Sequence, residues 1–169
     1  MNDVLDELDV SAPKESNQEI FNKRLLKSIP AQFEVAKWLF TKRRGNLNIS
    51  IPRMGLDEAD FLDEGDIIVN GEHVVEVKHR HNLNFTCYED FPFKEKTVII
   101  SNVAPTDRKT NTVLWVILNR PMTHAILVSR ASQPHWFKDE IWCANWNKYE
   151  WKYLVDLKHT KFVELFPKQ

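Results

Sequence analysis

The chain has few of the residues that mark several common classes of protein. It contains 4 glycines and 2 cysteines among 169 residues, too few and too scattered for a glycine-rich phosphate loop, a disulfide scaffold or a zinc finger. No serine or cysteine stands in a nucleophile-elbow context. No apolar run reaches membrane-spanning length, and the start, MNDVLDELDV, lacks the pattern of a signal peptide. We therefore expect a cytoplasmic protein with reduced thiols, no membrane partner and no nucleotide cofactor.

The rest of the composition indicates one folded domain. A hydrophobic fraction of 43% and an aromatic fraction of 11% are typical of a globular chain, and 169 residues fit a single domain. Residues 1–15 are acidic and are interrupted by Ser11 and Pro13, a composition typical of a flexible segment. We predict a flexible leader over 1–15 and one domain over 16–169.

Charge is segregated along the chain, although the net charge is only −1. Residues 20–56 carry eight bases and one acid, whereas residues 57–76 carry eight acids and no base. Such segregation permits a polyanion-binding face beside a carboxylate-rich site. Charges scattered over a solvated surface are the commoner explanation for any single cluster.

Hydrophobic periodicity predicts a basic helical region that leads into a sheet, which indicates a mixed α/β domain. Ser16 and Glu19 form a capping box, and we expect Pro30 to break or restart the helix, with a second helical run that ends at Gly45. The expected strands are 46–52, 66–70, 73–79, 97–102, 112–119 and 124–130, with a last strand in KYLVDL or KFVELF.

Three charges interrupt the apolar segment GDIIVNGEHVVEVKHR, namely Asp66, Glu76 and Lys78. A two-residue Asn-Gly turn would place the two carboxylates on opposite faces of a hairpin. A three-residue turn over 70–72 would instead set Asp66 opposite Glu76, with Cβ atoms roughly 4.5–5.5 Å apart and Lys78 on the same face. We favour the three-residue turn because the other face then becomes wholly apolar. That face consists of Ile67, Val69, Val75 and Val77.

Two adjacent carboxylates repel each other, and a divalent cation relieves the repulsion. Mg²⁺ takes one or two carboxylates, keeps several waters and shares its remaining positions with phosphate oxygens. We predict a Mg²⁺ or Mn²⁺ site made by Asp66, Glu76 and the carbonyl of Val77. Such a metal lowers the pKa of its water and polarises a phosphodiester, and Lys78 would orient that water and stabilise the charge on phosphorus.

The pattern GDII…VVEVKHR resembles that of the PD-(D/E)XK phosphodiesterase superfamily, which includes restriction enzymes, Holliday-junction resolvases and phage recombination nucleases. Asp66, Glu76 and Lys78 stand at the family's Asp and Glu-x-Lys places. Many members add an acidic residue on the first helix, and Glu34 in QFEVAKWLFTKRRG is the matching position. The resemblance covers about residues 32–102.

The resemblance implies a restriction-endonuclease-like core, in which a central mixed β-sheet is flanked by helices. It implies that Glu34 is an accessory catalytic carboxylate beside Asp66, Glu76 and Lys78. It also implies a full helix after the Glu-x-Lys strand, where this chain has the short segment HNLNFTCYEDFPFKEK with its Pro92. We predict a tryptophan-rich C-terminal extension, about 131–169, beyond this core.

Basic and aromatic residues supply further candidates for contact with nucleic acid. Arg80 shares the face of Lys78 and could bind a phosphate, or it could be an ordinary arginine at a strand end. Five bases lie on or after the expected helices, and they could form either a phosphate-binding surface or a solvated helix face. They are Lys23, Arg24, Lys42, Arg43 and Arg44. Four tryptophans of the C-terminal part could either stack on unpaired nucleobases or pack in a core. They are Trp136, Trp142, Trp146 and Trp151.

His79 and His81 share one strand face at a spacing that would suit a metal, but no third ligand is close in sequence. The expected function is metal-dependent hydrolysis of phosphodiester bonds in DNA, which leaves a 5′-phosphate. The alternative is a catalytically inactive module that binds nucleic acid or protein on the same fold. A homodimer is expected if both strands of a duplex are cut, because each cut takes one site.

Overall fold

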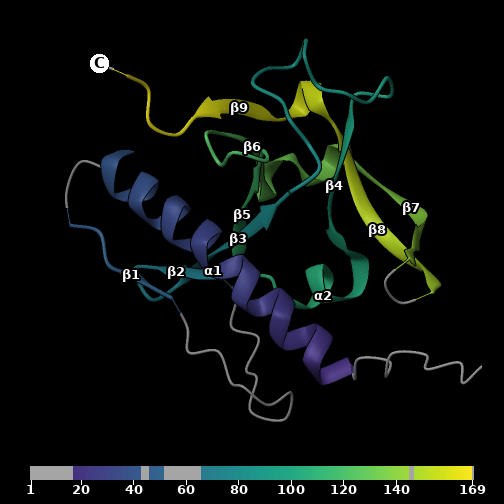
Figure 1. Ribbon diagram of the computed structural model, residues 1–169, viewed down its shortest axis with the longest axis horizontal. Coiled ribbons are helices and arrows are strands. Elements are labelled where there is room, and N and C mark those ends of the chain that lie inside the picture. The colour runs from purple at the N-terminus through teal and green to yellow at the C-terminus, as the bar shows by residue number, and fades with distance from the viewer. Residues whose placement is uncertain (1–16, 43–45, 52–65, 145–146, 169) are drawn as a thin grey trace, which may run out of the picture.

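The fold consists of a long helix, a six-stranded sheet and a three-stranded sheet (Figure 1). The computed structural model describes residues 17–42, 46–51, 66–144 and 147–168. The strands of the larger sheet are β1 (Ile49–Ser50), β2 (Ile67–Val69), β3 (His73–His79), β5 (Thr112–Leu118), β6 (His124–Ser129) and β9 (Lys161–Glu164). Those of the smaller sheet are β4 (Thr97–Asn102), β7 (Trp136–Cys143) and β8 (Lys148–Asp156). The helices are α1 (Asn17–Lys42) and α2 (Val103–Arg108), with 3-10 turns at Arg130–His135 and Leu157–His159.

The larger sheet is mixed, which confirms the expected α/β class. Its order is β1-β2-β3-β5-β6-β9, and only the central pair, β3 and β5, runs parallel among its described strands. Parallel neighbours need a crossover connection, so residues 80–111 leave the sheet between β3 and β5. This crossover carries β4 and the short α2 in place of the full helix that the resemblance implied.

The first part of the crossover, residues 80–96, is a loop held by its own polar groups. The Asp90 carboxylate accepts hydrogen bonds from the Thr86 N–H and hydroxyl at 2.6–2.9 Å. The Lys96 ammonium donates to three carbonyls of the loop, those of Tyr88, Glu89 and Phe91. These bonds satisfy backbone groups that a helix would otherwise pair.

α1 runs through Pro30 without interruption, so the expected break is wrong. Proline removes one backbone hydrogen bond and costs about 3 kcal/mol inside a helix. Packing on the next turns opposes this cost, because Ala31 and Val35 are buried against the larger sheet. The helix therefore continues to Lys42, and none of the described helices is long and apolar enough to cross a membrane.

The larger sheet is covered by α1 on one face and by the smaller sheet on the other. Residues of α1 form one core with Ile67, Val75 and Val77. On the opposite face, Trp115 and Ile117 form a second core with Ile100, Tyr153 and Val155 of the smaller sheet. The layers are therefore helix, sheet and sheet, and the smaller sheet stands on one face where the resemblance implied a mixed sheet flanked by helices.

The C-terminal residues are part of these layers. Both KYLVDL and KFVELF contribute a strand, since β8 ends at Asp156 and β9 covers Lys161–Glu164, and β7 was not expected. β9 joins the edge of the larger sheet beside β6. β7 and β8 pair from end to end, and Glu140–Cys143 with Lys148–Trp151 extend past the end of β4. We call these paired segments the β7–β8 arm.

The flexible leader that the sequence predicted over residues 1–15 lies outside the described residues.

Candidate active site

The hairpin that joins β2 to β3 has the three-residue turn that the sequence favoured. Val69 pairs with His73 and Ile67 pairs with Val75. Asn70 and Gly71 have φ values of 54° and 71°, a left-handed conformation that asparagine and glycine adopt most readily. Continued by one residue, this register would set Asp66, which directly precedes β2, opposite Glu76.

Asp66 is fixed at the start of β2 by two donors. The N–H of Val77 donates to its Oδ2 at 2.7 Å, and the Nε2 of Gln32 donates to its Oδ1 at 2.9 Å. Gln32 comes from α1 and is only 1% exposed. The carboxylate is therefore held by both the helix and the neighbouring strand.

The electrostatic environment of Asp66 favours its neutral form. Burial, followed by the nearby Glu76 carboxylate, raises the pKa of Asp66 from 3.8 to about 6. The Val77 N–H, Lys78 and Lys109 act in the opposite direction but do not cancel this effect. A further positive charge at this position would favour the ionised carboxylate.

Glu76 has a cationic partner that sequence reasoning missed. The Lys109 Nζ lies 3.2 Å from Glu76 Oε1, and the two side chains are 21% and 13% exposed. Lys109 follows α2 directly and enters the site through the crossover between β3 and β5. No local pattern could have identified it, because 33 residues separate it from Glu76.

Lys78 lies on the same wall as the two carboxylates, and its ammonium is available to a ligand. It lines the same cleft as Asp66 and Glu76, and its charge acts on Asp66. Within the described part of the chain, it makes no hydrogen bond or ion pair. A buried structural ion pair at Lys78 would have excluded a catalytic role, and the structure shows none among those residues.

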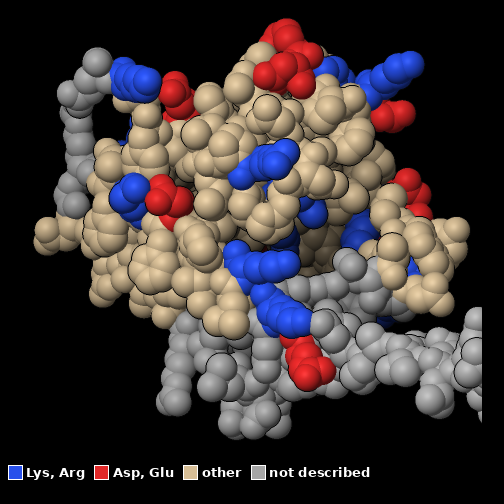
Figure 2. Space-filling model, in the orientation of Figure 1, with Lys and Arg blue, Asp and Glu red and all other residues tan. Residues whose placement is uncertain are grey.

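The site lies in a cleft of about 880 Å³ between α1, β3, α2 and the β7–β8 arm. Figure 2 shows this face hollowed beside α1, with lysine and arginine side chains at the edge and inside the hollow. The acids that line the cleft are Asp66, Glu76 and Glu150, and the bases are Lys78, Arg80, Lys109 and Lys152. Glu150 is already paired with Lys148 and Lys152, at 3.1 and 2.6 Å. The cleft therefore offers positive charge around the two carboxylates of the hairpin.

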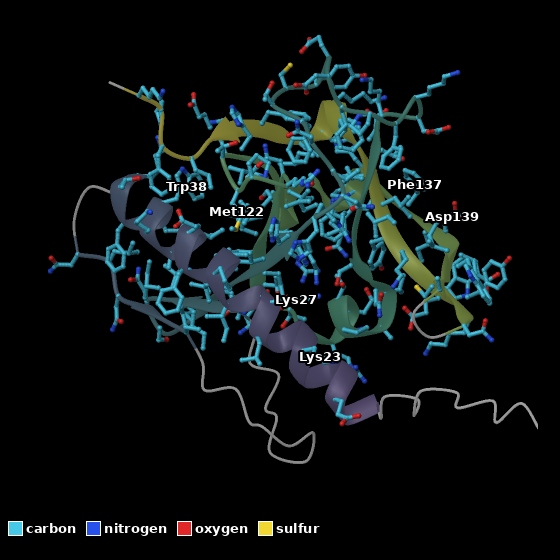
Figure 3. The ribbon with its side chains drawn as sticks, viewed as in Figure 1. Lys23, Lys27, Trp38, Met122, Phe137 and Asp139 are labelled. Atoms are coloured by element: carbon cyan, nitrogen blue, oxygen red, sulfur yellow. The ribbon has the colours of Figure 1, made fainter. Side chains whose placement is uncertain are left out.

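Two lysines of α1 add positive charge to the half of the helix that includes Ser28. Lys23 and Lys27 lie about one turn apart on the N-terminal half of the helix (Figure 3), and both are exposed. Ser28, the next residue after Lys27, lines the cleft. The basic N-terminal half of α1, rather than its C-terminal end, therefore approaches the site.

The oxygen atoms of the site fit a hard divalent cation. Asp66 and Glu76 provide carboxylates, and Val77 also lines the cleft. Two further buried oxygens, Gln32 Oε1 and Thr112 Oγ1, have no hydrogen-bond partner within the part of the chain that the structure describes, which is uncommon for buried polar atoms. No group of three or more His, Cys, Asp or Glu residues that could hold a metal occurs in the described ranges. Two carboxylates suit Mg²⁺, which keeps several waters, better than zinc or calcium.

Glu34 does not lie with the other three residues of the expected site. Its carboxylate pairs with Lys37 at 3.0 Å, and it is not part of the cleft wall. Helix residues two positions apart point about 200° away from each other, so the helix turns Glu34 outward when it turns Gln32 toward Asp66. The expectation of Glu34 beside Asp66 and Glu76 is therefore corrected, and Gln32 occupies that place.

The expected DNA-binding bases are divided between the cleft and other parts of the molecule. Arg80 lines the cleft, but its Nη2 donates to the Ile99 carbonyl at 3.1 Å, and burial lowers its pKa. Lys42 is exposed at the end of α1, roughly 15 Å along the axis from Gln32. Arg43 and Arg44 lie outside the described residues.

Some of the remaining candidate residues, the histidines at or just after the end of β3 and the tryptophans of the C-terminal part, make ordinary structural contacts. The His79 and His81 rings lie 4.0 Å apart, and His79 Nε2 is already hydrogen-bonded to the Arg120 carbonyl. Trp136 packs edge-on against the buried Trp115 at 5.1 Å, whereas Trp142 and Trp151 are exposed. Trp146 lies outside the described residues.

The chain was compared with protein-family models, curated proteins and solved structures. No family model, no curated protein and no solved structure matches it. A functional assignment therefore depends on the geometry and chemistry of the cleft.

Proposed function

We propose that the protein is a metal-dependent nuclease that hydrolyses phosphodiester bonds in DNA. One observation carries this proposal: Asp66, Glu76 and Lys78 converge on one wall of a basic cleft. The two carboxylates suit a hard cation, and the surrounding ammonium groups suit the phosphates of a nucleic acid. Hydrolysis of a phosphodiester uses both features in the same place.

Asp66, Glu76 and the Val77 carbonyl would hold Mg²⁺ or Mn²⁺. The bound ion would supply a water of lowered pKa and would polarise the phosphodiester. The chain supports this role in two ways. The raised pKa of Asp66 indicates a carboxyl group that gains from an added cation. Thr112 Oγ1 has no hydrogen-bond partner among the described residues, and Thr112 lines the same cleft, where this oxygen could accept a hydrogen bond from a metal-bound water.

Lys78 would act on the reacting phosphate. In the proposed hydrolysis, a water oxygen forms a bond to phosphorus, the bond from phosphorus to the 3′ oxygen breaks, and the products carry a 5′-phosphate and a 3′-hydroxyl. The proton lost by the water passes to the departing 3′ oxygen or to solvent. The Lys78 ammonium would orient the attacking water and stabilise the charge that develops on the phosphoryl oxygens. Lys109 and Lys152 would bind the same phosphate or its neighbours.

The order of elements supports a restriction-endonuclease-like core. A helix is followed by an antiparallel β2–β3 hairpin that carries the motif, and then by β5, which runs parallel to β3. The resemblance to the PD-(D/E)XK superfamily implied a mixed sheet with the motif on paired strands, and these elements are compatible with it. The crossover with β4 and α2 would be this chain's own variation.

A catalytically inactive DNA-binding module is the second candidate, and one observation favours it. Both carboxylates already have protein partners, because Asp66 accepts from Gln32 and Val77, and Glu76 pairs with Lys109. A site whose charges are satisfied within the protein needs no metal for stability. Such a module would bind DNA through the same basic cleft.

A cleavage assay distinguishes the two candidates. End-labelled single-stranded, linear duplex, nicked and branched DNA would be incubated with Mg²⁺, Mn²⁺ or a chelator. The native protein would be compared with Glu76→Gln and Lys78→Ala. Glu164→Gln is the matched control, because Glu164 is an exposed carboxylate on β9 and not part of the cleft wall.

A nuclease of the proposed type cuts only with metal, loses cutting with Glu76→Gln and with Lys78→Ala, and keeps it with Glu164→Gln. Metal-dependent cutting that survives both cleft substitutions would refute the assignment of the site. DNA binding without any cutting, under all metal conditions, would establish the binding module instead.

A further inference from the structure

A second, smaller cavity opens beside the cleft. It has a volume of about 540 Å³, within the range of 300–1,000 Å³ that is usual for small-molecule sites. Its walls are the Trp151 ring from β8 and the start of α2, residues Val103, Ala104 and Pro105, with Lys138 of β7 at its rim. We call this cavity the Trp151 slot.

Trp151 presents an open aromatic surface to the slot. Its side chain is 57% exposed, and in the described part of the chain its ring makes no aromatic or cation–π contact. A large exposed apolar ring at the wall of a cavity often marks a binding site. Facing it, the short side chains of α2 leave room for a flat ligand.

The slot and the cleft adjoin each other. Asn102, Pro105 and Glu150 line both cavities. Glu150 would repel a phosphate, but Lys148 and Lys152 pair with it. A nucleic acid strand with a phosphate between Lys109 and Lys152 could therefore place an adjoining base against Trp151 without crossing an uncompensated negative charge.

The chemistry of the two cavities fits different parts of one nucleotide. The cleft is lined by bases that suit phosphate oxygens. The slot is mostly apolar with an aromatic wall, which suits the π face of a nucleobase. Bases of an intact duplex are already stacked on both sides, so only an unpaired base could enter.

We propose that the Trp151 slot binds an unpaired nucleobase of a DNA strand whose backbone lies in the cleft. This inference rests on the proposed function, because it requires DNA in the cleft. It adds a substrate class: DNA with a single-stranded segment at the site, rather than uninterrupted duplex.

Binding in a chelator tests the slot separately from cleavage. Fluorescence anisotropy of a labelled single-stranded oligonucleotide and of its blunt duplex would be measured with native protein, Trp151→Ala, Trp151→Phe and Tyr149→Ala. Tyr149 is the matched control: it lies on the same strand and face, is 61% exposed and lines neither cavity. Trp151 is exposed, so its replacement should leave the fold intact.

We expect Trp151→Ala to weaken single-strand binding by roughly 5- to 150-fold, the usual contribution of one stacked base. Trp151→Phe should retain most of the affinity, and Tyr149→Ala should leave it unchanged. Duplex binding should not respond to Trp151→Ala. Equal effects of Trp151→Ala on single strand and duplex, or no effect on either, would overturn the proposal.

Photocrosslinking gives a second readout on unmodified protein. A single-stranded oligonucleotide that contains iodouracil should crosslink to the peptide that carries Trp151, and crosslinks only to other peptides would overturn the slot. The two proposals fail separately. If Trp151→Ala weakens single-strand binding but the protein cuts no DNA with any metal, the slot proposal is supported and the nuclease proposal is refuted. If cutting needs Glu76 and Lys78 but neither binding nor cutting depends on Trp151, the nuclease proposal is supported and the slot proposal is refuted.

Discussion

At Asp66, the folded protein places a carboxyl group where its charge is unfavourable. Burial and the Glu76 carboxylate favour the protonated acid, and the neighbouring cations only partly oppose them. A side chain of this kind is seldom selected for stability alone. The cost of its charge in the metal-free protein is the physical reason to expect a cation at this position.

The pH dependence of stability should report this cost. Folding raises the pKa of Asp66 from 3.8 to about 6. Protonation of Asp66 therefore stabilises the folded state, and this stabilisation is fully present below pH 3.8 and is lost as the pH rises through about 6. The corresponding free energy is at most about 3 kcal/mol. Urea unfolding in a chelator, across this pH range, should show native protein gaining stability relative to Asp66→Asn as the pH falls. A constant difference between the two proteins would contradict the raised pKa.

The Glu76 carboxylate could be neutralised either by Lys109, as in the structure, or by a bound cation. Lys109→Met leaves a buried Glu76 without its partner and should lower the free energy of unfolding by about 1–3 kcal/mol in a chelator. Mg²⁺ should restore part of this loss, because it supplies the missing positive charge. Lys37→Met is the control: its pair with Glu34 is 59% and 35% exposed and should contribute below about 1 kcal/mol. Equal losses in both variants, unaffected by Mg²⁺, would argue against a cation site at Glu76.

The candidate site residues that could be predicted from the sequence are those placed by the alternation of a strand. Alternation in GDIIVNGEHVVEVKHR correctly predicts the three-residue turn that pairs Val69 with His73 and Ile67 with Val75, because that register buries the apolar face. Lys109 could not be predicted, since it reaches Glu76 through a long crossover. Glu34 was misplaced because a motif fixes residue types but not the rotation of a helix, and that rotation is set by the apolar contacts of Ala31 and Val35.

Individual elements follow the sequence wherever hydrophobic alternation is strong. β3, β5 and β6 were expected within about one residue of their observed bounds. β7 was missed because its segment, WFKDEIWC, mixes charges with aromatics and is exposed along much of its length. The continuation of α1 through Pro30 was missed for the opposite reason, since a local breaker is overridden by tertiary packing.

Replacement of Pro30 tests how α1 tolerates its proline. Pro30→Ala restores a backbone donor to the Leu26 carbonyl and should stabilise the protein by about 1–3 kcal/mol. Pro121→Ala is the control: it lies in the turn closed by the Met122 N–H and the Asn119 carbonyl at 3.0 Å, where proline restricts the unfolded chain. That variant should lose about 0.4–1 kcal/mol. Thermal unfolding measures both, and a loss of stability in Pro30→Ala would mean that the packing of α1 depends on its proline.

Across the whole molecule, charge is distributed unevenly between the cleft and the rest of the surface. The chain has a net charge of −1, so the proposed binding of DNA requires a local concentration of bases. The cleft supplies Lys78, Arg80, Lys109 and Lys152 from three separate regions of the chain. The fold therefore assembles a group of bases, suited to the proposed phosphate binding, that no single basic segment of the sequence contains.

The salt dependence of DNA binding measures this local concentration. Contacts with three to four phosphates should give a slope of log K against log salt of roughly −2 to −3 for single-stranded DNA in a chelator. Lys78→Ala should reduce the slope by about 0.7, the share of one phosphate contact. Lys161→Ala, which removes an exposed base on β9, should leave it unchanged. A slope that responds equally to both variants would indicate diffuse binding outside the cleft.

Single-turnover cleavage is the most direct test of the proposed nuclease. Labelled DNA with a single-stranded segment would be mixed with excess native protein, Glu76→Gln or Glu164→Gln, and the reaction would be started with Mg²⁺. We expect native protein and Glu164→Gln to release products with a 5′-phosphate at the same rate, and Glu76→Gln to be slower on the order of 10²-fold or more. Cutting by Glu76→Gln at the native rate would contradict a catalytic metal site on the β2–β3 hairpin.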